Sequence, residues 1–292
     1  MDEKQAGGIG QDDLDAQYNP RLAVPAFAGH IAHWAESSKR VRLSEPGFLD
    51  IPYGDAPGQT LDFFPVQQNA RSDVPLLVFI HGGYWRALDK SDFSYVAPSF
   101  THAGAAVAVI NYRLISKVTL EDLVRDVLMA VTWCYLHAGH YGANPHHIYA
   151  TGHSAGGHLA AMLLAAQWPR WHGALPAEVV RGALSVSGLH DLEPVRHAPF
   201  IRDDLALDAK RALSMSPAFL PPATHASLLT AVGGDESAEF KRQSALIGSQ
   251  WKNVFMGDVS MPGFNHFTVC TDFGNRDSPL VRALLEMMFM SL

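Results

Sequence analysis

Short runs of consecutive apolar residues alternate along the chain with longer stretches in which apolar residues recur at helical spacing. The runs at 75–80 and 105–110 are apolar at almost every position, a pattern typical of strands that are covered on both faces. An alternating segment at 59–64 predicts an outer strand. Four further strands are predicted later in the chain, at 148–152, 181–187, 227–232 and 253–259.

Helical patterns separate these predicted strands. Thr119 and Asp122 form a capping-box sequence ahead of apolar residues that recur at helical spacing as far as Cys134. Helices are also predicted over the small-residue segment 155–167 and over 279–290. Strands that alternate with helices indicate the α/β class, with a mostly parallel central sheet and helices on both of its faces.

Three segments depart from this alternation. Residues 1–15 are acidic, glycine-containing and without periodicity, so we expect a mobile tail. Residues 16–42 have apolar spacing broken by prolines and predict a helical arm that packs on the main body. Residues 190–222 are rich in proline and predict a lid inserted over the carboxyl edge of the sheet. No repeat or linker divides the rest, so residues 16–292 are interpreted as a single domain.

Composition narrows the functional classes. With 48% hydrophobic residues the chain can bury a large core, and its net charge of −7 argues against nucleic acid as a partner. The first residues resemble no secretory signal, and the most apolar stretch, 155–166, is too short to span a membrane. We therefore expect a cytoplasmic protein that acts on a small molecule. Cys134 and Cys270 have no metal or disulfide spacing and are interpreted as packing residues.

A candidate nucleophile lies between a predicted strand and a predicted helix. Residues 152–156 read Gly-His-Ser-Ala-Gly, and this strand-to-helix context is the one that the G-x-S-x-G motif requires. A nucleophilic serine needs a tight turn, and the flanking glycines relieve the crowding there. Ser154 is therefore the candidate nucleophile; the plainer alternative is a serine that only caps the helix.

A second motif follows the 75–80 strand and reads His-Gly-Gly-Tyr-Trp from His81 to Trp85. Acyl transfer requires backbone N–H groups directed at the developing oxyanion. Gly82, Gly83 and Tyr84 are predicted to supply such groups together with Ala155. Read alone, the segment is also compatible with an ordinary turn that buries Trp85.

A serine of this kind needs a histidine base that is oriented by a carboxylate. Asp235 follows the predicted strand 227–232, and His266 follows the next strand at the same sheet edge. We therefore predict a triad of Ser154, Asp235 and His266. Two other carboxylates compete for the acid's position: Asp191, whose plainer reading is a cap or turn, and Glu236, the neighbour of Asp235.

The remaining histidines do not indicate a cofactor. Those at 137, 140, 146 and 147 lack a metal-ligand pattern, and no G-x-G-x-x-G follows a strand. We expect neither a metal nor an organic cofactor.

These residues resemble the α/β-hydrolases of the arylformamidase (kynurenine formamidase) group, which are related to hormone-sensitive-lipase-like esterases. The resemblance is carried by segments 81–85, 111–114, 151–159, 187–194, 233–237 and 265–267. Lipase-like relatives usually have a third glycine where this chain has Tyr84. The segment 111–116 lacks the alanine-proline pair that often follows its arginine and leucine in the family.

The resemblance implies a serine hydrolase of the α/β-hydrolase fold that cleaves an N-formyl arylamine such as N-formylkynurenine. A short-chain carboxylesterase is the alternative, and a non-catalytic binding module is a more distant one. The resemblance also implies the triad and the oxyanion loop that were predicted from the motifs. The substrate pocket is predicted to contain Tyr84, Trp85, His153, Ile115 and Phe267. A homodimer is left open.

Overall fold

The computed structural model describes residues 11–67 and 73–290 and contains an eight-stranded sheet with the strand order β1-β2-β4-β3-β5-β6-β7-β8. The strands from β4 to β8 run parallel, whereas β1 and β2 pair antiparallel at one edge. Their bounds are β1 (Phe48–Pro52), β2 (Thr60–Phe64), β3 (Leu76–Ile80), β4 (Ala106–Ile110), β5 (Ile148–His153), β6 (Val180–Val186), β7 (Ser227–Gly233) and β8 (Phe255–Met261).

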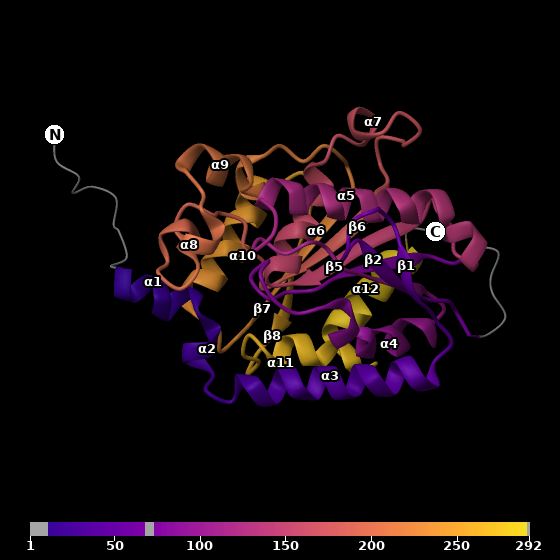
Figure 1. Cartoon of the computed structure of the whole chain (residues 1–292), viewed down its shortest axis with the longest axis horizontal. Coiled ribbons are helices and arrows are strands. Elements are labelled where there is room, and N and C mark those ends of the chain that lie inside the picture. The colour runs from indigo at the N-terminus through magenta and orange to yellow at the C-terminus, as the bar shows by residue number, and fades with distance from the viewer. Residues whose placement is uncertain (1–10, 68–72, 291–292) are drawn as a thin grey trace.

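Helices cover both faces of the sheet, as Figure 1 shows. One face packs against α5 (Leu120–His137), α6 (Ala155–Ala165) and α10 (Ala238–Gln250), and the other against α3 (Phe27–Ser44), α4 (Ala97–Thr101), α11 (Thr268–Thr271) and α12 (Pro279–Met290). The shorter helices are α1 (Gln11–Tyr18), α2 (Pro20–Ala23), α7 (Trp168–Trp171), α8 (Arg202–Leu205) and α9 (Ala209–Ser214).

The continuous apolar runs have the predicted physical cause. In β3, Leu76, Val78 and Ile80 belong to the core on one face, while Leu77 and Phe79 belong to the core on the other. All five side chains are fully buried. Successive strand residues point to opposite faces, so a strand that is covered on both sides has no polar position. The prediction of an α/β fold with a mostly parallel sheet is confirmed.

One prediction about the N-terminal region is wrong, and one strand was missed. Residues 11–15 belong to helix α1, so the predicted tail is wrong for that part; residues 1–10 lie outside the described residues. Strand β1 was not predicted, because its residues are mostly exposed and show no alternation. The arm at 16–42 is helical, and Trp34 of α3 is buried against the body.

The topology gathers the functional segments at one edge of the sheet. The strands β3, β5, β7 and β8 are parallel, and each is followed by one of the predicted motifs. The loop after β3 carries residues 81–85, and Ser154 follows β5 directly. The acidic turn, which contains Asp235 and Glu236, follows β7, and His266 follows β8. The 190–222 segment, which includes α8 and α9, reaches this edge through Phe200.

Candidate active site

Ser154 stands on a strained turn between β5 and α6. Its backbone lies at φ 58° and ψ −117°, a conformation that residues with a side chain rarely adopt. Its N–H donates to the carbonyl of Val186 on the neighbouring strand, at 2.8 Å. The turn also needs Gly156, because a Cβ there would come within 1.9 Å of the Ile80 carbonyl oxygen. The strand-to-helix context predicted for the motif is present.

The loop after β3 lines the same pocket as Ser154 through Gly83 and Tyr84. Gly83 lies at φ 104°, and a Cβ there would come within 2.2 Å of the Ala87 carbonyl oxygen. Its own carbonyl accepts from Arg86 and Ala87, at 3.1 Å each. The N–H groups of Gly83, Tyr84 and Ala155 donate to no acceptor in the described part of the chain. Of the four predicted oxyanion donors, Gly83 and Tyr84 line the pocket that contains Ser154, so their N–H groups are available to a bound oxygen. Gly82 and Ala155 do not line it.

His266 is held by a buried carboxylate. Its Nδ1 lies 2.6 Å from Oε2 of Glu236, and both side chains are almost fully buried. A carboxylate only accepts hydrogen bonds, so Nδ1 carries the proton and Nε2 is the free base. The other oxygen of Glu236 accepts from the Ser187 hydroxyl at 2.6 Å and from the Gly233 N–H at 2.7 Å. Ser187 and Gly233 therefore hold the carboxylate in place, and the carboxylate in turn orients the imidazole.

The prediction that Asp235 orients His266 is wrong. Its side chain is exposed, and its backbone N–H donates to the Phe264 carbonyl at 3.0 Å. The turn after β7 directs the next residue inward, which brings Glu236 and not Asp235 to His266. Asp191 also faces elsewhere, since its carboxylate pairs with Arg242 at 3.2 Å.

Three of the five residues predicted for the substrate pocket line the cavity beside Ser154 and His266, namely Tyr84, His153 and Phe267. Trp85 and Ile115 do not line it. Trp85 is fully buried, and its indole N–H donates to His158 Nδ1 at 3.2 Å. The Ile115 N–H donates to the Trp85 carbonyl, and the Ile115 side chain packs against the hydrophobic core.

The sequence reasoning missed several walls of the pocket. Trp34 and Ile31 come from α3 of the helical arm, and Phe200 comes from the predicted lid. Residues 19–21 are the N-cap and the first two residues of α2. None of these residues belongs to a motif. The only signal was indirect, because the arm was predicted to pack on the body and the lid to cover this edge.

His153 is a neutral neighbour of the predicted base. Burial holds the pKa of His153 well below its ordinary value. Its ring centroid lies 4.6 Å from that of His266, and Nε2 is buried with no hydrogen-bond partner among the described residues. A neutral ring here avoids repulsion when His266 gains a proton.

Two other features bear on the class of site. Within residues 11–67 and 73–290, no three His, Cys, Asp or Glu side chains are grouped to hold a metal ion. None of the helices described is long and apolar enough to cross a membrane.

A mostly parallel sheet with this strand order and a strained serine elbow between β5 and α6 defines an α/β-hydrolase. The BD-FAE family model matches residues 61–170. Kynurenine formamidase from Salmo salar is 30% identical over 296 residues, covering 96% of this chain and 97% of the relative. The enzyme of the same name from Danio rerio is 29% identical with the same coverage. A solved structure from Silicibacter sp. superposes with a TM-score of 0.81 at 28% identity, covering 92% and 98% of the two chains.

The chain belongs to the kynurenine formamidase family and is a hydrolase. The resemblance predicted from the motifs is confirmed.

Proposed function

We propose that this hydrolase removes the formyl group from an aryl formamide, with N-formylkynurenine as the substrate of choice, and that Ser154, His266 and Glu236 carry the reaction. The observation that supports this most strongly is the 2.6 Å hydrogen bond from His266 to buried Glu236. It leaves Nε2 of His266 free to accept a proton in the cavity that Ser154 also lines. The curated relatives supply the substrate class.

In the proposed reaction, the Ser154 hydroxyl oxygen attacks the formyl carbon while His266 Nε2 takes its proton. The carbonyl oxygen becomes an oxyanion and accepts hydrogen bonds from the N–H groups of Gly83, Tyr84 and Ala155. His266 then protonates the leaving nitrogen, and the C–N bond breaks to release the aryl amine. Water, deprotonated by His266, then attacks the formyl ester on Ser154. The bond between the formyl carbon and the Ser154 oxygen breaks, His266 returns the proton to that oxygen, and formic acid leaves and ionises to formate. Glu236 stabilises the imidazolium in both steps.

The pocket favours a small acyl group. Tyr84 is almost fully buried, and its ring packs edge-on against Phe200 at 4.8 Å. Its hydroxyl donates to the Tyr18 carbonyl, so the ring is held at both ends. A wall fixed in this way leaves little freedom to accommodate a long acyl chain, which favours the formamide reading over a general carboxylesterase.

The function is tested with purified protein on N-formylkynurenine, formanilide and phenyl butyrate. We expect formate and aryl amine in equal amounts from both formamides, and no turnover by Ser154→Ala. Turnover of phenyl butyrate without any formamide hydrolysis would instead identify a carboxylesterase. The cytoplasmic location, the absence of nucleic-acid partners and a homodimeric state stay predictions.

A further inference from the structure

The N-terminal strap, defined as residues 11–23 with helices α1 and α2, carries residues of the pocket wall. Asn19, Pro20 and Arg21 line the same cavity as Ser154 and His266. These residues follow Tyr18, which is fully buried although it lies close to the start of the described chain. The strap therefore forms part of the site.

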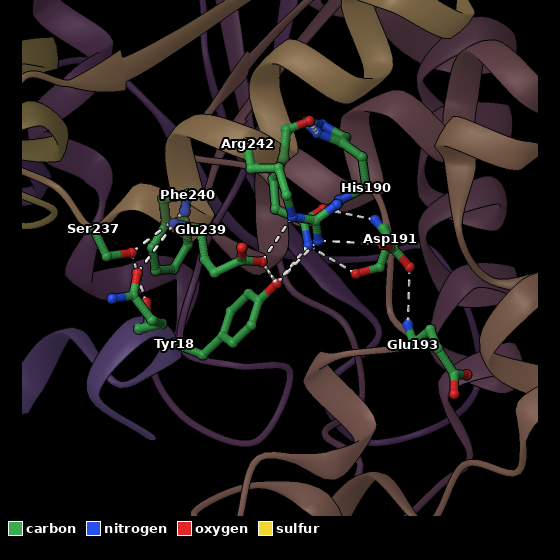
Figure 2. Close-up of polar contacts among 10 residues, drawn as sticks. Tyr18, His190, Asp191, Glu193, Ser237, Glu239, Phe240 and Arg242 are labelled. Atoms are coloured by element: carbon green, nitrogen blue, oxygen red, sulfur yellow. Dashed lines mark hydrogen bonds and ion pairs between the residues drawn. The ribbon is translucent and has the colours of Figure 1, made fainter. Parts of the chain in front are cut away.

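Tyr18 is anchored by a buried polar network on α10, which Figure 2 shows. Its hydroxyl donates to the carboxylate of Glu239 and accepts from Gln243 Nε2 at 3.1 Å. Arg242 Nη2 lies 3.3 Å from the same hydroxyl, and its Nε donates to Glu239 at 2.8 Å. Several bonds on one buried hydroxyl hold the backbone on either side of it.

Further hydrogen bonds tie the strap to the other loops of the site. The Ser237 hydroxyl donates to the Gln17 carbonyl at 2.6 Å, next to Glu236. The Phe200 N–H donates to Asp15 at 3.0 Å, and Tyr84 donates to the Tyr18 carbonyl. The strap thus contacts the acidic turn, the lid segment and the oxyanion loop. The backbone at Arg21 has a fixed place at the rim.

The charge at this rim differs from that of the whole chain. The net charge is −7, yet the residues that line the cavity include two arginines and no aspartate or glutamate. Arg86 is already paired with Asp204 and donates to the Phe200 carbonyl at 2.9 Å. Arg21 is exposed and forms no ion pair with any described residue. An unneutralised cation therefore remains at the entrance.

Aromatic contacts connect this cation to Phe267, the residue after His266. The Arg21 guanidinium lies over the Phe27 ring, 5.1 Å from its centroid. Phe27 in turn packs on Phe267 at 6.0 Å, and Phe267 follows His266. A guanidinium on an aromatic face keeps its N–H edges free, and its fork matches both oxygens of a carboxylate.

We infer that Arg21 is a specificity-determining residue that binds a carboxylate on the amine portion of the substrate. The inference rests on the proposed function, because a formyl group has no room for a charge and the carboxylate must then lie on the leaving amine. The preferred substrates are aryl formamides whose amine portion carries a carboxylate. Arg21 touches only this remote group, so it lowers KM and leaves the chemical step unchanged.

The test compares two substrates that differ only in this charge, N-formylkynurenine and its carboxamide, with formanilide as the reference for the chemistry. The variants are Arg21→Gln, which removes the charge, and Arg21→Lys, which keeps the charge but not the fork. Arg125→Gln is the matched control, since its side chain is 62% exposed on α5 and lines no part of the cavity. It changes the net charge by the same amount.

The wild type should prefer the carboxylate over the carboxamide about 10-fold in kcat/KM. Arg21→Gln should remove this preference through KM, while Arg21→Lys retains part of it and Arg125→Gln retains all of it. The preference should weaken as the ionic strength rises from about 0.05 M to about 0.5 M, because salt screens the attraction between Arg21 and the carboxylate.

A wild type without the preference would overturn the inference, as would an Arg21→Gln variant that loses activity equally on both substrates. Either result with formanilide still hydrolysed leaves the proposed function intact. A protein that hydrolyses no formamide at all contradicts the proposed function itself.

Discussion

His266 donates a hydrogen bond from Nδ1 to Glu236, whereas Asp235, the neighbour of Glu236, is exposed to solvent. Replacing Glu236 by Gln puts an amide against Nδ1 and removes the charge that stabilises the imidazolium. We expect kcat/KM to fall on the order of 10²–10⁴-fold. Asp235→Asn is the matched control and should change kcat/KM less than about threefold. A larger loss for Asp235→Asn than for Glu236→Gln would return the acid to position 235.

Substitutions at Ser154 separate chemistry from backbone strain. Ser154→Ala should lower kcat by a factor on the order of 10³ or more, with the fold retained. Alanine keeps the penalty of φ 58°, whereas glycine relieves it. Ser154→Gly should therefore be about 1 kcal/mol more stable than Ser154→Ala, as measured by urea unfolding. Equal unfolding midpoints for the two variants would mean that the elbow stores no strain.

Buried neutral histidines set the acid limit of stability. Burial lowers the pKa of His81 and His158 to about 4 and that of His190 to about 3, and it lowers the pKa of His153 as well. In the unfolded chain each has a pKa of about 6.5, so the unfolded state binds more protons. Their contribution is fully present above pH 6.5 and is lost as the pH falls toward 4.

The measurement is the free energy of unfolding between pH 5 and 7. Each histidine that is protonated only on unfolding adds a slope of about 1.4 kcal/mol per pH unit near pH 5. His158→Gln removes one such group. It should reduce the slope by about 1.4 kcal/mol per pH unit, the contribution of one proton, whatever its effect on stability at pH 7. An unchanged slope would show that His158 is already protonated in the folded protein.

Much of the fold was predictable because its signals are local. The buried strands appear as continuous apolar runs, and the capping box at Thr119 marks the start of α5 where the structure has it. Strand β1 was not predictable, because an exposed edge strand needs no apolar pattern and is defined only by its pairing with β2.

The difference between local signals and tertiary contacts also explains which residues of the candidate site could be predicted. Ser154 and the loop at Gly83 occur in motifs, because a tight turn requires glycine at set positions. The choice between Asp235 and Glu236 depends on how the turn after β7 closes, since adjacent residues point in different directions. The contributions of Trp34 and Phe200 depend on tertiary packing between segments that are far apart in the chain.

The acyl preference tests the central claim most directly. The measurement is kcat/KM for N-formylkynurenine and N-octanoylkynurenine, which share one leaving amine and differ only in the acyl group. With Tyr84 held between Phe200 and the Tyr18 carbonyl, the long chain should be rejected by about 10–200-fold. Octanoyl turnover as fast as formyl turnover would contradict a formamidase and indicate an esterase of broad specificity.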